Sequence, residues 1–249
     1  MNAIYMVEDY GTKTWTEIMV ALNSGINTVI VPIGTVEAHG KHLPITTDAI
    51  LPLEICKRLS DKVKALVAPP IYYGVTTSLS NYPGSIAVSK QAFASYLTDI
   101  FIGFAKTGFL NIIVVNGHAG NIESIKEAAE KAYEKARIRV LDINWYVVCE
   151  DIVKKHYNTL SGHGTIAETA AILAVDQKLV KKDLYDKRQE IRRIEGIWMY
   201  PMVASMIKRD ELDSPNFDLD KGKKFFEDVC QTTENVIIDY MVRASENPL

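Results

Sequence analysis

Short apolar runs alternate along the chain with longer segments in which apolar residues recur every three or four positions. The runs are rich in β-branched residues, which is typical of buried strands. They lie at Asn27–Ile33, Ala65–Ile71, Asn111–Val115 and Ile138–Ile143. This alternation predicts an α/β fold in which helices cover both faces of a mostly parallel sheet.

Several of the expected helices carry start and stop signals. Thr14 and Glu17 have the spacing of a capping box, and Ser89 precedes a long amphipathic segment that Gly108 ends. Further helices are expected from about Asn121 to Ala132, from Thr165 to Leu173 and from Asp220 to Val242. The segment from Tyr185 to Pro215 is the least regular part of the chain.

The composition is that of an ordinary soluble globular protein. The 249 residues suit one large α/β domain spanning residues 1–249, and 47% of them are hydrophobic. A formal charge of -3 does not provide the basic surface that nucleic acids or anionic membranes require. No apolar run approaches the ~20 residues of a membrane-spanning helix. The expected partner is therefore a small molecule.

Two further features concern the cellular compartment. Residues 1–15 carry acidic side chains and lack a basic region followed by an apolar core, so a secretory signal is not expected. Cys56, Cys149 and Cys230 are widely separated and have no C-x-x-C spacing, which indicates reduced thiols used for packing. Both observations favour a cytoplasmic protein.

The most unusual segment of the chain follows the first apolar run. Two carboxylates and two imidazoles lie within Gly34–Asp48, including Glu37, His39 and Asp48. In open α/β sheets ligands bind at the carboxyl ends of the strands, where these groups are expected to emerge. We place Asp48 just before a helix, where free backbone N–H groups and the helix dipole favour an ionised carboxylate.

A second polar segment, Asn116–Asn121, also follows a predicted strand and opens a helix. It should therefore reach the same edge of the sheet, and the small residues around His118 allow a close approach of the backbone. Two imidazoles and two carboxylates from such loops would suit zinc, manganese or iron, as nitrogen and oxygen ligands of intermediate hardness.

The third segment contains His163 and Glu168, and here two interpretations stay open. Thr165 and Glu168 have capping-box spacing, so Glu168 could serve only to cap a helix. His163 lies between two glycines and could be an exposed loop residue. Likewise, Glu37, His39 or Asp48 taken singly could be a surface residue or a helix cap.

Other polar and aromatic residues allow simpler interpretations. His42 either orients a metal ligand or makes a structural hydrogen bond. Tyr72, Tyr73 and Tyr82 are more typical of a core or a pocket wall than of catalysis. Nucleotide-binding glycine loops and a serine-nucleophile elbow are missing from the sequence.

Three motifs together resemble the creatininase (creatinine amidohydrolase) family. They are Val31–Pro44 followed by Asp48, Asn116–Asn121 (N-G-H-A-G-N) and His163–Thr169. The stretch Tyr73–Ile86 is also similar, so the resemblance runs in order from about Pro32 to Thr169. The C-terminal third matches only weakly.

The resemblance implies a three-layer α/β/α sandwich, usually assembled into hexamers, that binds one or two divalent metal ions. Glu37, Asp48 and His118 would bind the first ion, and His39 with a bridging Asp48 the second. Creatininase takes a further ligand from a glutamate where this chain has Gly120, and Glu168 is the natural substitute. His163 matches the histidine to which the family assigns proton transfer.

These expectations define a metal-dependent amidohydrolase in which a metal-held hydroxide attacks a cyclic amide or a formamide. His163 would pass a proton to the leaving nitrogen, and His163 and Glu168 are the candidate catalytic residues. The segment Tyr185–Pro215 would cover the active site or form a subunit contact. The alternatives are a relative that hydrolyses an oxidised inositol or a peptide, and a non-catalytic protein that binds a metal or a small ligand.

Overall fold

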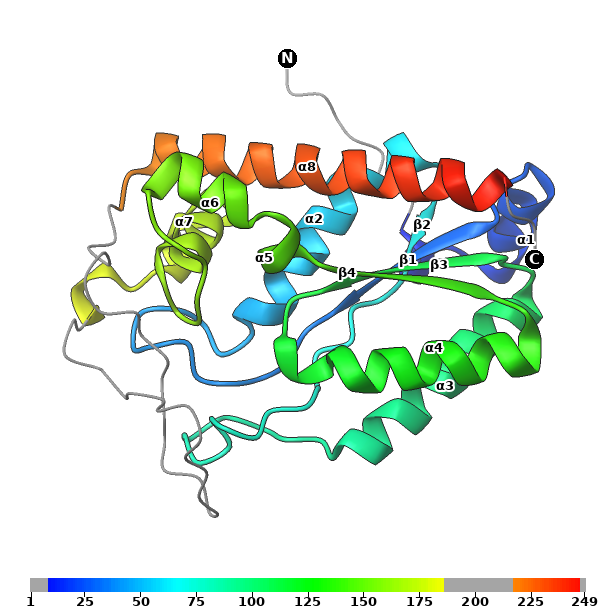
Figure 1. Ribbon diagram of the computed structural model, residues 1–249, viewed down its shortest axis with the longest axis horizontal. Coiled ribbons are helices and arrows are strands. Elements are labelled where there is room, and N and C mark those ends of the chain that lie inside the picture. Colours follow the sequence, from blue (N-terminus) through cyan, green and yellow to red (C-terminus); the bar gives the residue numbers. More distant parts are fainter. Residues whose placement is uncertain (1–8, 186–216, 247–249) are drawn as a thin grey trace.

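The computed structural model describes residues 9–185 and 217–246, which build a central sheet between two layers of helices (Figure 1). The sheet contains β1 (Thr28–Ile33), β2 (Leu66–Val67), β3 (Asn111–Asn116) and β4 (Arg139–Asn144). All three strand pairs are parallel, and the order across the sheet is β2-β1-β3-β4. The predicted parallel sheet is thus confirmed.

The central strands explain the continuous apolar runs. Every residue of β1 and β3 is buried, because helices cover both faces of the sheet. The strand β2 is shorter than predicted, since it ends at Val67 rather than Ile71. Pro69 and Pro70 follow it, and proline has no N–H with which to continue a ladder.

Helices pack on the two faces of the sheet around two separate apolar cores. One face carries α1 (Trp15–Asn23), α3 (Lys90–Thr107) and α4 (Ile122–Ala136). The other face carries α2 (Thr47–Val63), α7 (Ile166–Val175), α8 (Leu219–Glu246) and the short helices α5 (Trp145–Val148) and α6 (Glu150–Tyr157). The short helices α5 and α6 were not predicted from the sequence.

The predicted helix signals are present. Thr14 and Glu17 form the capping box of α1, and the Ser89 hydroxyl accepts a hydrogen bond from the backbone N–H of Ala92 at the start of α3. Gly108 ends α3 with a φ of 117°, a left-handed conformation that glycine adopts without strain. Within the described residues, no helix has both the length and the apolar character needed to cross a membrane.

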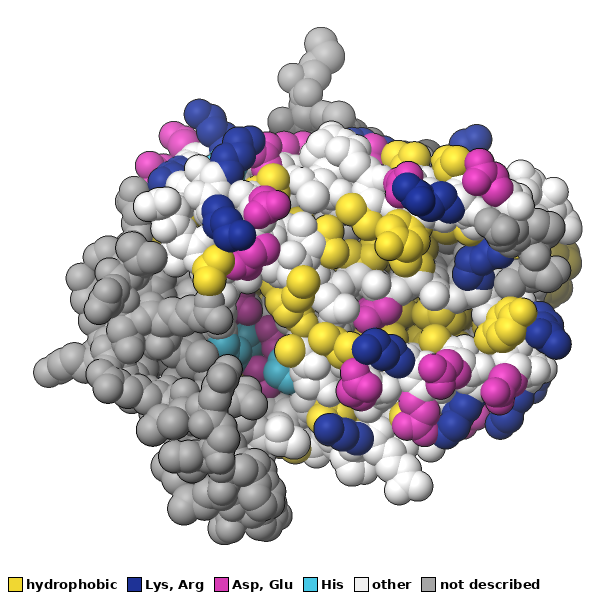
Figure 2. All heavy atoms as spheres, viewed as in Figure 1, with side chains coloured by type: hydrophobic (Ala, Val, Ile, Leu, Met, Phe, Trp, Pro, Cys, Tyr) yellow, Lys and Arg dark blue, Asp and Glu magenta, His cyan; other side chains and the backbone are white. Residues whose placement is uncertain are grey.

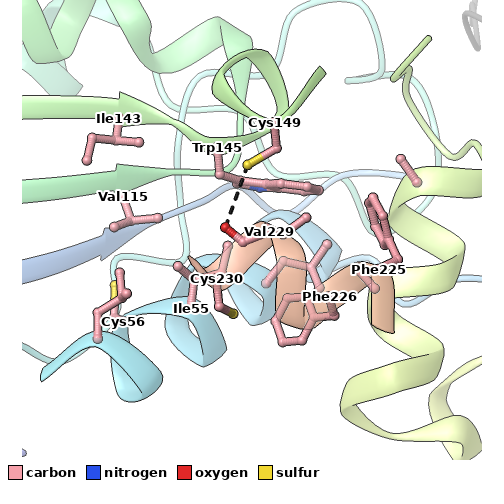
Figure 3. Packing of buried hydrophobic residues seen from close by; sticks show 14 of the residues in the cluster. Ile55, Cys56, Val115, Ile143, Trp145, Cys149, Phe225, Phe226, Val229 and Cys230 are labelled. Carbon is pink, nitrogen blue, oxygen red and sulfur yellow. Dashed lines mark hydrogen bonds between the residues drawn. The ribbon is translucent and has the colours of Figure 1, made fainter. Parts of the chain in front are cut away.

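The larger core lies between the sheet and α8 (Figure 3). The indole of Trp145 packs over α8, from which Phe225 and Phe226 fill the space toward α2 and α7. Cys56, Cys149 and Cys230 are free and buried, and all three belong to this larger core. The prediction that they are reduced packing residues is confirmed.

Candidate metal centre

The loops that follow β1 and β3 meet at the carboxyl edge of the sheet. Ile33 and Asn116, the last residues of these neighbouring strands, are paired in register. The loop before α7 reaches the same edge, as the 2.6 Å contact between His163 Nε2 and the Ala38 carbonyl shows. Figure 2 shows histidine and acidic side chains together in a hollow of this face.

The predicted site residues form two neighbouring groups. In the first, His118 Nδ1 lies 3.2 Å from Glu37 Oε1 and 3.0 Å from Asp48 Oδ2. In the second, His39 Nε2 lies 2.8 Å from Asp48 Oδ1 and 3.9 Å from Glu168 Oε2. Within each group the nitrogen and oxygen atoms lie within 4.8 Å of one another, and Asp48 belongs to both.

A third histidine borders the same centre. His163 Nδ1 is 3.4 Å from Glu37 Oε1, and its ring lies 4.1 Å from the ring of His39, measured between centroids. Its side chain is only 16% exposed. His163 is therefore not a solvent-exposed loop histidine, and the structure places it beside the two carboxylate groups.

Backbone carbonyls determine which way each histidine faces. His39 Nδ1 donates to the Glu37 carbonyl at 3.1 Å, and His118 Nε2 donates to the Val75 carbonyl at 2.9 Å. His163 Nε2 donates to the Ala38 carbonyl. Because a carbonyl oxygen only accepts, these nitrogens carry the ring protons. The other nitrogen of each ring is directed at the carboxylates, as in a prepared metal ligand.

Glycines permit the close approach of the loops. A Cβ added to Gly117 would lie 2.1 Å from the Asp48 carbonyl oxygen. A Cβ added to Gly120 would lie 2.2 Å from the Val75 carbonyl oxygen and 2.6 Å from His118 Nε2. Position 120, for which the family resemblance implied a metal-binding glutamate, therefore has no room for a side chain here.

Two of the simpler interpretations are wrong. Asp48 is not a helix cap that precedes α2: it is the second residue of α2, Thr46 occupies the cap position, and the Asp48 carboxylate faces His39 and His118. Glu168 does not complete a capping box, because the Thr165 side chain makes no cap hydrogen bond. Its Oε2 does accept a backbone N–H at the start of α7, that of Gly164 at 2.5 Å, but it also lies 3.9 Å from His39 Nε2, so it does not serve only as a cap.

The structure also places the remaining candidates. His42 is buried and its Nε2 lies 2.9 Å from Thr169 Oγ1, so it joins its loop to α7 next to Glu168. Tyr72 and Tyr73 are 40% and 56% exposed and are not core residues. Tyr185 packs against His42 with ring centroids 5.0 Å apart, while the rest of the predicted covering segment, residues 186–215, lies outside the described residues.

Two supporting contacts were not predicted from the sequence. The Glu150 carboxylate accepts hydrogen bonds from the backbone and the hydroxyl of Ser161, and so anchors the loop that carries His163. Asn144 ends β4 as Asn116 ends β3, and the two side chains are hydrogen bonded at 2.8 Å. The repeated asparagine at the end of adjacent parallel strands was a signal that could have identified this pair.

The charges of the centre depend strongly on one another. Burial acts to lower the pKa of His39, but the Asp48 and Glu168 carboxylates outweigh it and raise that pKa to about 10. His118 has its pKa raised to about 10, since the Asp48 and Glu37 carboxylates outweigh its burial. Without a bound metal ion, protons on these two imidazoles thus supply the positive charge that the carboxylates need.

In the other two groups burial dominates the pKa and favours the neutral form. Burial, together with the neighbouring charge of His39, lowers the pKa of His163 to about 4. Burial raises the pKa of the Glu168 carboxyl to about 7. His163 is therefore neutral at pH 7, and Glu168 can exchange a proton near that pH.

The buried carboxylate oxygens that lack hydrogen-bond partners indicate whether a metal ion fits this site. Both carboxylate oxygens of Glu37 and Oδ2 of Asp48 are buried and have no hydrogen-bond partner among the described residues, so only the charged imidazoles beside them compensate these carboxylates in the metal-free protein. An uncompensated buried carboxylate is costly, so such groups normally pair with a cation. Oxygen donors together with imidazole nitrogens suit zinc, manganese or iron. The residues present therefore fit a divalent metal ion.

Comparisons with known proteins agree with this fold. The family model described as creatinine amidohydrolase matches residues 12–237. A solved structure of a mutant creatininase, described as "Zn-Zn type", has a TM-score of 0.84 at 22% identity, covering 94% of this chain and 98% of that one. One titled "Creatininase Mn" has a TM-score of 0.82 at 23% identity, covering 93% and 97%. The predicted α/β sandwich is confirmed.

Curated relatives include three named activities. The creatinine amidohydrolase of Pseudomonas putida is 26% identical over 70% of this chain and 74% of its own. The 3-dehydro-scyllo-inosose hydrolase of Thermotoga maritima is 30% identical over 59% and 50%, and the mycofactocin precursor peptide peptidase of Mycolicibacterium smegmatis is 31% identical over 43% and 45%. Since the family model spans most of the sequence, the chain belongs to the creatininase family of hydrolases.

Proposed function

We propose that this chain is a metal-dependent hydrolase that cleaves a C–N bond in a small molecule such as a cyclic amide or a formamide. Glu37, Asp48 and His118 would hold one divalent ion, and His39, Asp48 and Glu168 a second. One observation carries the proposal: buried carboxylate oxygens without hydrogen-bond partners among the described residues face the imidazole nitrogens of His39 and His118 that do not donate to backbone carbonyls. Cytoplasmic location and hexameric assembly stay predictions.

The residues of the chain have distinct tasks in this proposal. When bound, a divalent ion supplies a Lewis acid for a carbonyl oxygen and lowers the pKa of coordinated water to about 7. His163 holds its Nδ1 free toward Glu37, because its Nε2–H is tied to the Ala38 carbonyl. Being neutral at pH 7, it would accept at Nδ1 a proton from the attacking water and would deliver it to the leaving nitrogen.

Glu168 connects the second metal group to the proton carrier. Its Oε2 accepts the backbone N–H of Gly164, the residue after His163, and also faces His39. The same carboxylate thus holds the His163 loop against the centre. Position 120 cannot supply a ligand to the second ion, because any side chain there would collide with the Val75 carbonyl. Glu168 would supply that ligand instead.

Metal analysis combined with a substrate panel tests the proposal. The purified protein should contain zinc, manganese or iron, and should hydrolyse at least one compound among lactams, formamides and cyclic ureas. In His118→Ala, metal content and activity should be lost together, whereas His156→Ala, a histidine on α6 outside the centre, should keep both. An active, metal-free His118→Ala protein would contradict the ligand assignment.

Two relatives justify a wider panel. One is named as a hydrolase of 3-dehydro-scyllo-inosose and another as a peptidase of a precursor peptide, so an oxidised inositol and short peptides belong in the assay. If the protein hydrolyses only these compounds, the proposed metal centre stands and the proposed amide substrate is wrong. A protein that binds metal but hydrolyses nothing in the panel would support the non-catalytic alternative.

A further inference from the structure

Three polar side chains form a row from the edge strand of the sheet to the metal loop. Asn116 and Asn144 end β3 and β4 and are paired in register. Asn116 Nδ2 donates to Asn144 Oδ1 at 2.8 Å, and Asn144 Nδ2 donates to Asp142 Oδ2 at 3.0 Å. The row therefore reaches β4, the strand farthest from β2, and lies outside the ligand groups already described.

At its inner end the row holds the backbone of His118. Asn116 Nδ2 donates to the His118 carbonyl at 2.8 Å, and Asn116 Oδ1 accepts the His118 N–H at 3.1 Å. Asn116 Oδ1 also accepts from Asn121 Nδ2 at 3.2 Å, and Asn121 Nδ2 donates to the Gly34 carbonyl at 3.0 Å. The Asn116 amide thus fixes both backbone groups of a proposed metal ligand, and Asn121, which donates to Asn116, ties this loop to the loop after β1.

The hydrogen bonds along this row all run in one donor-to-acceptor direction, which Asp142 sets at the outer end. A carboxylate only accepts hydrogen bonds, whereas an asparagine amide can turn so that either end faces a partner. Asp142 therefore draws the Asn144 NH2 group toward itself, which leaves Asn144 Oδ1 for Asn116. Asn116 must then present its NH2 group to Asn144, which leaves its Oδ1 free to accept the His118 N–H. The Tyr146 hydroxyl also donates to Asn144 Oδ1, at 3.3 Å.

We propose that Asp142 and Asn144 are positioning residues that act through Asn116 to hold His118 in its metal-binding orientation. This inference rests on the proposed function, since it requires that His118 binds a metal ion. Outer hydrogen-bond partners of metal ligands typically contribute 10- to 100-fold to metal affinity or activity. Asp142 and Asn144 should contribute in that range, although neither contacts a ligand side chain.

Zinc affinity, measured with a competing chromophoric chelator, tests the inference. Asn144→Ala should bind zinc roughly 10- to 100-fold more weakly than the wild type. Asp142→Ala should also weaken zinc binding, because the Asn144 amide can then turn. Asp142→Asn keeps an oxygen that can accept from Asn144 and should recover most of the affinity lost in Asp142→Ala. The absorption spectrum of the cobalt-substituted protein should change in Asn144→Ala, because the His118 ring shifts.

Asn111→Ala is the matched control. Asn111 lies at the other end of β3, where its Oδ1 accepts from Arg139 of β4 at 3.2 Å and the two residues are paired in register. This variant removes a hydrogen bond between the same two strands, so it can lower thermal stability, but its zinc affinity and cobalt spectrum should match the wild type.

The possible results separate this inference from the proposed function. Wild-type zinc affinity and an unchanged cobalt spectrum in Asn144→Ala would overturn the inference alone. If Asn144→Ala does not fold, equal zinc affinity in Asp142→Ala, Asp142→Asn and the wild type would also overturn it. A wild-type protein that binds no zinc, manganese or iron would overturn the proposed function, and the inference with it.

Discussion

Two regions of this protein are equally buried and differ in what their burial does. The core around Trp145 and Phe225 consists of apolar side chains packed between the sheet and α8 (Figure 3). At the carboxyl edge of the sheet, Glu37 and His39 are just as inaccessible, being 1% and 0% exposed. Burial of the apolar region stabilises the fold by roughly 1.5–3 kcal/mol per large side chain. Burial of the carboxylates opposes folding unless a cation accompanies them.

The difference shows how a functional site can be recognised without a ligand. In the apolar core most buried atoms are carbons that need no hydrogen-bond partner, although the Trp145 indole N–H lacks one. In the candidate metal centre, charged oxygens of Glu37 and Asp48 are buried without hydrogen bonds from the described residues, and glycines at 117 and 120 have no room for a side chain. The protein holds these carboxylates in place without satisfying their hydrogen-bonding capacity, which is characteristic of a site prepared for a ligand.

The largest difference between the two regions should appear in a pair of histidine substitutions. His163→Ala, at the metal centre, should lower kcat by roughly 10²- to 10⁴-fold while the metal content is unchanged, because only the proton carrier is removed. His156→Ala is the control: it is similarly buried, but it packs against Phe225 and pairs with Asp228. Kinetics of both metal-loaded variants check this, and equal rates would exclude a catalytic role for His163.

A substitution in the apolar core should have a comparable but purely structural effect. Phe225→Ala removes a fully buried ring that contacts Tyr157, with centroids 5.3 Å apart, and should lower the free energy of unfolding by about 3–5 kcal/mol. Urea denaturation measures the loss. Metal content per folded molecule should stay at the wild-type value, and loss of metal from folded Phe225→Ala would show that the two regions are coupled.

A third difference concerns the pH dependence of the metal-free protein. His39 and His118 have folded-state pKa values raised to about 10, so their contribution to stability is complete below pH 6.5 and is lost as the pH rises toward 10. Each proton contributes a slope of up to about 1.4 kcal/mol per pH unit. Urea denaturation of chelator-treated protein between pH 6.5 and 10 measures it.

Zinc should remove this slope, because metal ligation requires neutral imidazoles and releases their protons. The zinc-loaded protein should therefore keep its stability over the same pH interval in which the metal-free protein loses it. Identical profiles with and without zinc would contradict the assignment of His39 and His118 as ligands.

Much of the fold and of the candidate site could be predicted because it depends on local pattern. The four strands follow from apolar runs, and the caps of α1 and α3 from Thr14, Glu17 and Ser89. The end of β2 was not predicted, although Pro69 and Pro70 mark it in the sequence. The short helices α5 and α6 were not predicted because they depend on tertiary packing. The placement of Asp48 before α2 was wrong, since the start of a helix is a weak local signal.

The sequence by itself determined the order of the elements and which residue types reach one edge of the sheet, because helical and strand periodicity and the carboxyl ends of parallel strands are local consequences of the chain. Only the tertiary structure decided how the imidazoles of His118 and His163 are turned. The carbonyl that orients His118 is 43 residues away in sequence, and the one that orients His163 is 125 residues away. Hydrogen bonds over such separations depend on how the layers pack, so no pattern along the chain records them.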